Sequence, residues 1–120
     1  MSLRVLVAED QPFLLEITGE VLREAGHEVL EATDGAEAER MARAEKPDIL
    51  LLDIMMPERD GREVARRLRS EQGLDGMRIV YYTPMTKDEF DWRATGADAF
   101  RSKTESVREL PGFLEELSAR

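Results

Sequence analysis

Five short hydrophobic runs recur along the chain, and longer segments with helical periodicity separate them. Continuous apolar runs rich in Val, Ile and Leu indicate strands that are buried on both faces of a parallel sheet. The sequence therefore predicts strands over residues 3–8, 27–32, 48–53, 77–82 and 97–102. The third run reads D-I-L-L-L-D and is the most hydrophobic of the five, which indicates a central strand.

Amphipathic segments between these runs predict helices. Apolar residues at helical spacing, together with Pro and Gly at the expected ends, place helices over residues 11–25, 35–45, 62–72, within 86–95 and over most of 106–119. Pro111 and Gly112 interrupt the last segment. Either Ser106 and Glu109 cap a helix that then bends, or the regular helix begins near Pro111.

This alternation of strands and helices predicts an α/β fold. We expect a doubly wound (βα)5 five-stranded parallel sheet with helices on both faces, because short parallel strands need right-handed crossovers. The 120 residues suit a single domain that spans residues 1–120. In such sheets ligands bind beyond the carboxyl ends of the strands, so the residues that follow each strand carry the functional information.

Composition narrows the classes of function. The 26 acidic and 17 basic residues leave a net charge of −9, which opposes direct contact between this domain and nucleic acid. The absence of cysteine excludes disulfides and thiol catalysis and agrees with a cytoplasmic location. No apolar run approaches the roughly 20 residues that span a bilayer, so no membrane association is expected. The single histidine, His27, is expected at the surface.

Polar and charged residues follow four of the predicted strands. Glu9 and Asp10 follow the first, Asp53 ends the third, Thr83 follows the fourth and Lys103 the fifth. The first and third strands are neighbours in this fold, so the three carboxylates should converge. Two like charges about 4 Å apart repel by about 4 kcal/mol at an effective dielectric constant near 20, which requires a compensating cation. Mg²⁺, which prefers oxygen ligands, fits this requirement.

Carboxylates beside Mg²⁺, with a lysine and a hydroxyl, form a site for a phosphoryl group. An aspartate nucleophile yields an acyl phosphate, and Asp53 is the candidate nucleophile. The metal ion, Thr83 and Lys103 would share the charge of the phosphoryl oxygens.

These residues belong to longer motifs: V-A-E-D at 7–10, D-I-M-M-P-E-R-D-G at 53–61 and G-A-D-A-F at 96–100. With Thr83 and Lys103, they make the chain resemble the receiver domain of bacterial two-component response regulators, over essentially its whole length. The resemblance implies a flavodoxin-like fold with strand order 2-1-3-4-5. It also implies a phosphoacceptor signalling domain, not an enzyme, with self-phosphorylation and self-dephosphorylation as its only chemistry.

The resemblance also assigns roles to individual residues. Asp53 would be phosphorylated by a sensor histidine kinase or phosphotransfer protein, and Glu9, Asp10, Asp53 and the backbone carbonyl of Met55 would hold Mg²⁺. Thr83 and Phe100 would form the switch pair that controls a downstream protein or a fused output domain. Such regulators often pair through the face formed by the fourth helix, the fifth strand and the fifth helix.

Family members usually control dephosphorylation through the side chains two residues after the aspartate and two after the threonine. Here both positions hold thioethers, at Met55 and Met85, and thioethers orient water poorly. The resemblance therefore implies slow self-dephosphorylation.

Three departures from the family pattern lie between the fourth strand and the last helix. Thr104 stands where a proline usually follows the lysine, often through a cis bond, Pro84 stands where a small residue is usual, and the segment between Thr83 and Lys103 is short. A non-proline cis bond costs about 2.5–4 kcal/mol. We therefore expect an atypical fourth helix, with no family-type dimer through this face.

Other classes of function stay open. The main alternative is a receiver-like module that binds proteins without phosphorylation. A dehalogenase-type phosphatase would need a second aspartate at position 55, which is Met55 here. An FMN carrier would need a loop rich in glycine or hydroxyl groups where the chain has Glu9-Asp10-Gln11-Pro12. Whether the chain is complete or part of a longer one is also open.

Overall fold

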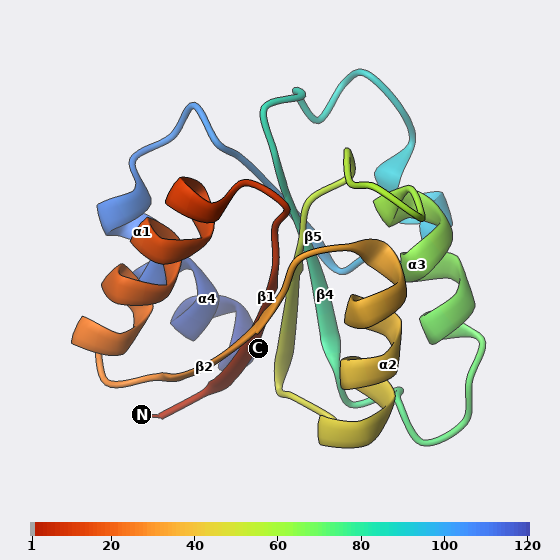
Figure 1. Ribbon diagram of the computed structural model, residues 1–120, viewed down its shortest axis with the longest axis horizontal. Coiled ribbons are helices and arrows are strands. Elements are labelled where there is room, and N and C mark those ends of the chain that lie inside the picture. The colour runs from red at the N-terminus through yellow and green to blue at the C-terminus, as the bar shows by residue number, and fades with distance from the viewer. Residues whose placement is uncertain (1) are drawn as a thin grey trace.

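A computed structural model describes residues 2–120. Five parallel strands form one sheet in the order β2-β1-β3-β4-β5, with helices on both sides (Figure 1). The strands are β1 (Arg4–Ala8), β2 (Glu28–Ala32), β3 (Ile49–Leu52), β4 (Arg78–Thr83) and β5 (Ala99–Ser102). The predicted fold class and strand order are therefore confirmed.

Two pairs of helices cover the sheet (Figure 1). Helices α1 (Pro12–Glu24) and α4 (Leu110–Ser118) cover one face, and α2 (Gly35–Glu45) and α3 (Gly61–Arg69) cover the other. Alternate strand residues point to opposite faces, so the core divides into two hydrophobic clusters. Val5 and Val7 belong to the cluster beside α1 and α4, whereas Leu6 and Ala8 belong to the other.

The central strand aligns the ends that carry the candidate site. All four residues of β3 are buried, which agrees with its uninterrupted run of Ile and Leu. Ala8 of β1 lies opposite Leu52 of β3 in the register. The residues that follow these two strands therefore emerge side by side at one edge of the sheet.

The prediction of an α-helix within residues 86–95 is wrong. The structure has only a short 3-10 turn, η1 (Trp92–Thr95), after turns and bends over residues 84–91. Pro84 lacks a backbone donor, which opposes helix growth there. Phe90 and Trp92 turn inward and pack on Phe100, with ring centroids 6.2 and 6.1 Å away. Residues 2–120 thus contain four α-helices where the sequence predicted five.

The C-terminal segment follows the second of the two interpretations. Residues Val107–Glu109 form a 3-10 turn, η2, and the regular helix α4 begins at Leu110 with Pro111 in its first turn. Ser106 Oγ accepts a hydrogen bond from the amide of Arg108 at 3.3 Å. The peptide bond between Lys103 and Thr104 is trans.

His27 is buried, so its expected surface position is wrong. Its Nδ1 accepts a hydrogen bond from the amide of Leu3 at 3.0 Å, and its Nε2 lies 2.7 Å from Glu115 Oε2. Because Nδ1 accepts, the ring proton lies on Nε2 and is donated to Glu115. His27 therefore joins the start of β2 to β1 and α4.

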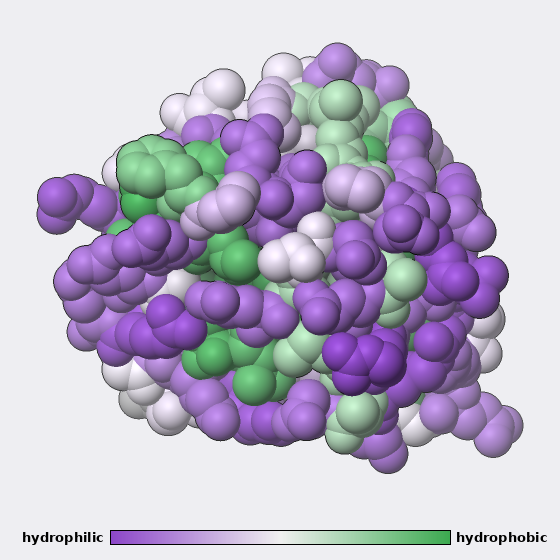
Figure 2. Space-filling view, in the orientation of Figure 1, coloured by the Kyte–Doolittle hydropathy of each residue, from purple (hydrophilic) through white to green (hydrophobic). Residues whose placement is uncertain are grey.

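The molecular surface is mainly hydrophilic. Figure 2 shows small hydrophobic patches over the start of α1 and along β2, with hydrophilic side chains over most of α2 and α3. Phe13, at the start of α1, is 69% exposed. Within residues 2–120, no helix combines the length and apolar character needed to cross a membrane.

Candidate functional site

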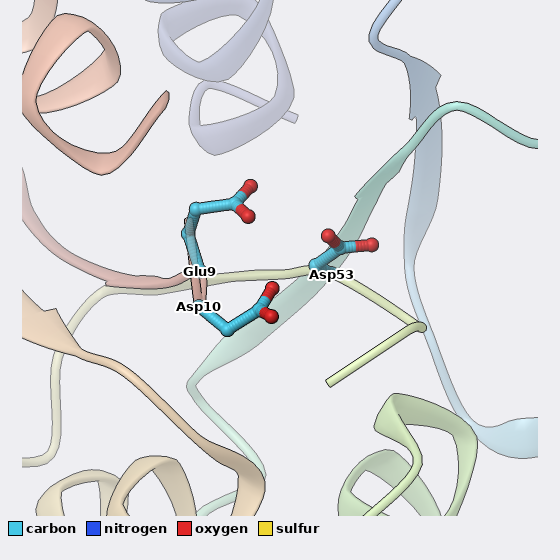
Figure 3. Close-up of side chains that lie close together, drawn as sticks. All are labelled: Glu9, Asp10 and Asp53. Carbon is cyan, nitrogen blue, oxygen red and sulfur yellow. The ribbon is translucent and has the colours of Figure 1, made fainter. Parts of the chain in front are cut away.

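Three carboxylates meet at the carboxyl ends of β1 and β3. Glu9 and Asp10 directly follow β1, and Asp53 directly follows β3. Each contributes an oxygen to a group whose members lie within 4.8 Å of one another. Figure 3 shows the side chains of Asp10 and Asp53 facing the same space, with Glu9 beside them. Glu9 and Asp53 are 3% and 5% exposed, so their charges need a nearby partner.

Lys103 supplies that partner. Its Nζ donates to Asp53 Oδ2 at 2.9 Å and also to Glu9 Oε1. Burial lowers the pKa of Lys103, but the hydrogen bonds to Glu9 and Asp53 outweigh burial and raise the pKa above its usual value. Burial raises the pKa of Glu9, and the bond to Lys103 offsets only part of this rise. The ammonium group is therefore held charged between two acids.

Thr83 presents a buried hydroxyl with no protein partner. It ends β4 opposite Ser102 of β5, and its carbonyl accepts a hydrogen bond from the Lys103 amide at 2.8 Å. Within residues 2–120, Thr83 Oγ1 is one of two buried side-chain polar atoms without a hydrogen bond. An unpaired buried hydroxyl costs about 1–3 kcal/mol, so a ligand oxygen that accepts a hydrogen bond from Thr83 would be stabilised here.

Phe100 lies on the same face of the sheet as Thr83. Thr83 pairs in register with Ser102, and residues two apart on a strand share a face, so Phe100 also points toward the α2 and α3 side. Its ring packs on Tyr81 with centroids 6.3 Å apart. The structure thus places the two residues of the predicted switch pair on adjacent strands.

The loop between β3 and α3 borders a cavity of 710 Å³. Its lining includes Asp10, Met55 and Met85, so the thioethers of the two methionines face one space. Met55 is 66% exposed, and its amide donates to Asp53 Oδ1 at 3.3 Å. Three carboxylates at this end of the sheet match the oxygen ligands that Mg²⁺ prefers.

Sequence reasoning missed three residues around the site. Arg62 and Glu89 line the same cavity, and the Arg62 guanidinium lies 5.4 Å from the Phe90 ring centroid. The Tyr82 ring lies 5.7 Å from Lys103 Nζ. No motif marks Arg62 or Glu89, and Tyr82 looks like any other hydrophobic residue of its strand. Only the tertiary contacts reveal them.

The fold and the acidic cluster together define a doubly wound α/β domain with a group of carboxylates that could hold a metal ion beyond its strand ends. The family model of the response regulator receiver domain matches residues 5–114, so the chain belongs to this family. The predicted family is confirmed.

Individual relatives agree with this assignment. The chain is similar to the alkaline phosphatase synthesis transcriptional regulatory protein PhoP of Bacillus subtilis (strain 168), with 32% identity over 100% of this chain and 50% of PhoP. It is also similar to the polar-differentiation response regulator DivK of Brucella ovis, with 31% identity over 99% of this chain and 96% of DivK. The chain spans about half the length of PhoP and of several other curated relatives that it matches.

A solved structure supports the fold independently. The receiver domain of the Francisella response regulator 1452 superposes with a TM-score of 0.87 and 26% identity. The superposition covers 98% of each chain. The absence of an α-helix between β4 and β5 therefore leaves the overall family architecture in place.

Proposed function

We propose that Asp53 accepts a phosphoryl group in a Mg²⁺-dependent reaction and that residues 1–120 form a phosphoacceptor domain. The observation that carries this proposal is the convergence of Glu9, Asp10 and Asp53 within 4.8 Å, with Lys103 bonded to Asp53. A carboxylate held beside a fixed cation at a topological switch point suits attack on a phosphoryl donor.

The reaction forms one bond and breaks another. A carboxylate oxygen of Asp53 attacks phosphorus, and the bond from phosphorus to the donor nitrogen or oxygen breaks, with its electron pair leaving on the donor. Lys103 lies close enough to Asp53 to neutralise the oxygens of the transferred group. The Thr83 hydroxyl has no hydrogen-bond partner and would donate a hydrogen bond to one of these oxygens.

Glu9, Asp10, Asp53 and the backbone carbonyl of Met55 would hold the ion. Bound Mg²⁺ would neutralise charge that develops on the phosphoryl oxygens. Without it, one lysine faces three carboxylates. The excess negative charge would repel an incoming phosphoryl donor.

Phosphorylation would act on other proteins through the pair Thr83 and Phe100. The donor would be a sensor histidine kinase or phosphotransfer protein, and the recipient of the signal a downstream protein or a fused output domain. The net charge of −9 argues against direct contact with nucleic acid through this domain.

A receiver-like binding module that works without phosphorylation is the second candidate. The packing of Phe100 against Tyr81, Phe90 and Trp92 favours it, because these contacts restrain the ring that would have to move. The two candidates differ in whether Asp53 takes phosphate.

Intact mass after incubation with acetyl phosphate and Mg²⁺ separates them. We expect a gain of one phosphoryl group, which disappears in Asp53→Asn and with a chelator. Asp48→Asn is the matched control, because Asp48 lies at the opposite end of the same strand and accepts the Arg4 amide at 2.8 Å. A gain that persists in Asp53→Asn, or no gain in the unmodified protein, would refute the assignment.

A further inference from the structure

Glu39 on α2 is a fully buried carboxylate outside the phosphoryl site. Arg59 Nη1 lies 2.5 Å from its Oε2, whereas Arg67 Nε and Arg43 Nη2 lie 2.9 and 3.0 Å from its Oε1. Burial raises the pKa of Glu39, but hydrogen bonds from the three arginines outweigh burial and hold the pKa below its usual value. Glu39 is therefore a charged anchor, with one oxygen devoted to Arg59.

Arg59 depends on this anchor more than the other two arginines do. Within the part of the chain that the structure describes, Glu39 is the only carboxylate paired with Arg59. The other two guanidinium groups each have a second acid, at 2.5 and 3.8 Å: Arg43 with Glu71, and Arg67 with Glu63. Removing the Glu39 charge would thus release Arg59 while each of the others kept a partner.

Arg59 lies in the loop that begins at Asp53 and ends at α3. The first residue of α2, Gly35, packs directly on this loop, because a Cβ added there would lie 2.7 Å from the Arg59 carbonyl oxygen. The Gly35 amide donates to the Pro57 carbonyl at 3.4 Å. The ion pair between Arg59 and Glu39 adds a side-chain tie between the same loop and α2.

The other end of the loop reaches the candidate site. The Met55 amide donates to Asp53 Oδ1 at 3.3 Å, so a shift of the loop would move the Met55 backbone relative to the phosphoacceptor carboxylate. We propose that Glu39, acting through Arg59, is a positioning residue for Mg²⁺ binding and phosphorylation at Asp53. It holds the loop so that the Met55 backbone stays beside Asp53. This inference rests on the proposed function.

The test compares Mg²⁺ affinity, measured by isothermal titration calorimetry, with the rate of phosphorylation by acetyl phosphate. Groups that support metal ligands typically change affinity by about tenfold or more when removed. We expect Glu39→Gln and Arg59→Gln each to weaken Mg²⁺ binding by about tenfold. Phosphorylation should slow at low Mg²⁺ and recover toward the wild-type rate at saturating Mg²⁺. The double variant should be no worse than either single variant, because both remove the same tie.

Arg43→Gln and Arg67→Gln are the matched controls. Each removes a guanidinium group from Glu39 but leaves the pair with Arg59 intact. Both should keep wild-type Mg²⁺ affinity, even where thermal unfolding shows a loss of stability like that of Arg59→Gln. Unchanged affinity in Arg59→Gln, or equal weakening in the controls, would overturn the proposal. Arg59→Gln decides the question even if Glu39→Gln fails to fold.

The unmodified protein separates this inference from the proposed function. If it binds Mg²⁺ but gains no phosphoryl group, the proposed function fails, and the affinity comparison still decides the role of Glu39. If it binds no Mg²⁺, both proposals are overturned.

Discussion

The hydroxyl of Tyr81 lies 2.6 Å from Thr95 Oγ1 and joins β4 to the η1 turn. Thr95 donates its single hydroxyl proton to the Trp92 carbonyl at 2.7 Å, so Tyr81 is the donor to Thr95. The Tyr81 ring also packs on Phe90, with centroids 5.8 Å apart. These contacts order a segment that has no regular helix.

Tyr81→Phe should therefore destabilise the protein. The change removes one buried hydrogen bond, and we expect the free energy of unfolding to fall by about 1 kcal/mol. Urea unfolding measures this difference. Tyr82→Phe is the control, because the Tyr82 hydroxyl makes no hydrogen bond to residues 2–120, and its effect should stay within about 0.5 kcal/mol. Equal losses in both variants would contradict the role given to Tyr81.

The buried anchor Glu39 predicts a pH-dependent contribution to stability. Its pKa is lowered from 4.5 in the folded state, so its contribution is complete above about pH 4.5 and is lost as pH falls through the folded pKa. Glu39→Gln should cost about 1–3 kcal/mol at neutral pH, because it leaves a poorer partner for the arginines. This difference between the two proteins should shrink on acidification below pH 4.5.

Urea unfolding of both proteins at neutral and acid pH measures that difference. Glu116→Gln serves as control, because Glu116 is exposed and its pair with Arg120 is long, at 3.7 Å. The control should change stability by at most about 0.5 kcal/mol. A Glu39→Gln effect that is independent of pH would show that the charge of Glu39 does not stabilise the fold.

The paired thioethers predict a long-lived acyl phosphate. Met55 and Met85 line one cavity, and neither can orient a water molecule as an amide or carboxylate can. The combined substitutions Met55→Asn and Met85→Glu should shorten the lifetime by about tenfold, since one orienting hydrogen bond is worth about 1.4 kcal/mol. Loss of phosphorylated mass with time gives the lifetime. An unchanged or longer lifetime would disprove this explanation.

The free hydroxyl of Thr83 predicts a measurable switch. Beryllofluoride, a mimic of the acyl phosphate, would give Thr83 a charged hydrogen-bond acceptor worth about 1.5–3 kcal/mol. The ligand can shift the equilibrium between the two conformations only by its difference in affinity for them. Phe100 lies 6.1 Å from the single tryptophan, Trp92, so a movement of Phe100 should change Trp92 fluorescence. Thr83→Ser should keep the change and Thr83→Ala should lose it. An equal response in Thr83→Ala would exclude Thr83 as the trigger.

The irregular segment between β4 and β5 predicts whether the activated protein forms a dimer. A dimer through residues 84–95, β5 and α4 would need a regular helix that is absent between β4 and β5. We therefore expect the protein to stay monomeric in small-angle scattering with Mg²⁺ and beryllofluoride. A dimer that crosslinks through Trp92 and α4 would contradict this expectation.

The residues at the strand ends were predictable, because each lies directly beside the hydrophobic run that forms its strand. Glu9, Asp10 and Asp53 each follow a hydrophobic run, and parallel strands bring their carboxyl ends to one edge of a sheet. A small error in the strand boundaries does not change that outcome. The convergence of the carboxylates could therefore be predicted from the strands, whereas the family and the strand order were predicted from the resemblance that the motifs at 7–10, 53–61 and 96–100 carry.

The region between β4 and β5 was predictable only in part. Pro84 and the short segment indicated an irregular helix, but Phe90 and Trp92 could have lain on a helix as easily as in a loop. Their inward packing on Phe100 depends on β5, which forms a platform only in the folded protein.

The sequence by itself determined the sheet and the carboxylates at its edge, because hydrophobic periodicity and strand-end residues act over a few neighbouring positions. Only the tertiary structure decided which polar side chains are buried. Glu39 meets Arg59 and Arg67 across 20 and 28 residues, and His27 meets Glu115 across 88. A buried charge or imidazole is stable only when partners satisfy it. Arg43 lies one helical turn from Glu39, but nothing near Glu39 or His27 in the chain identifies their distant partners.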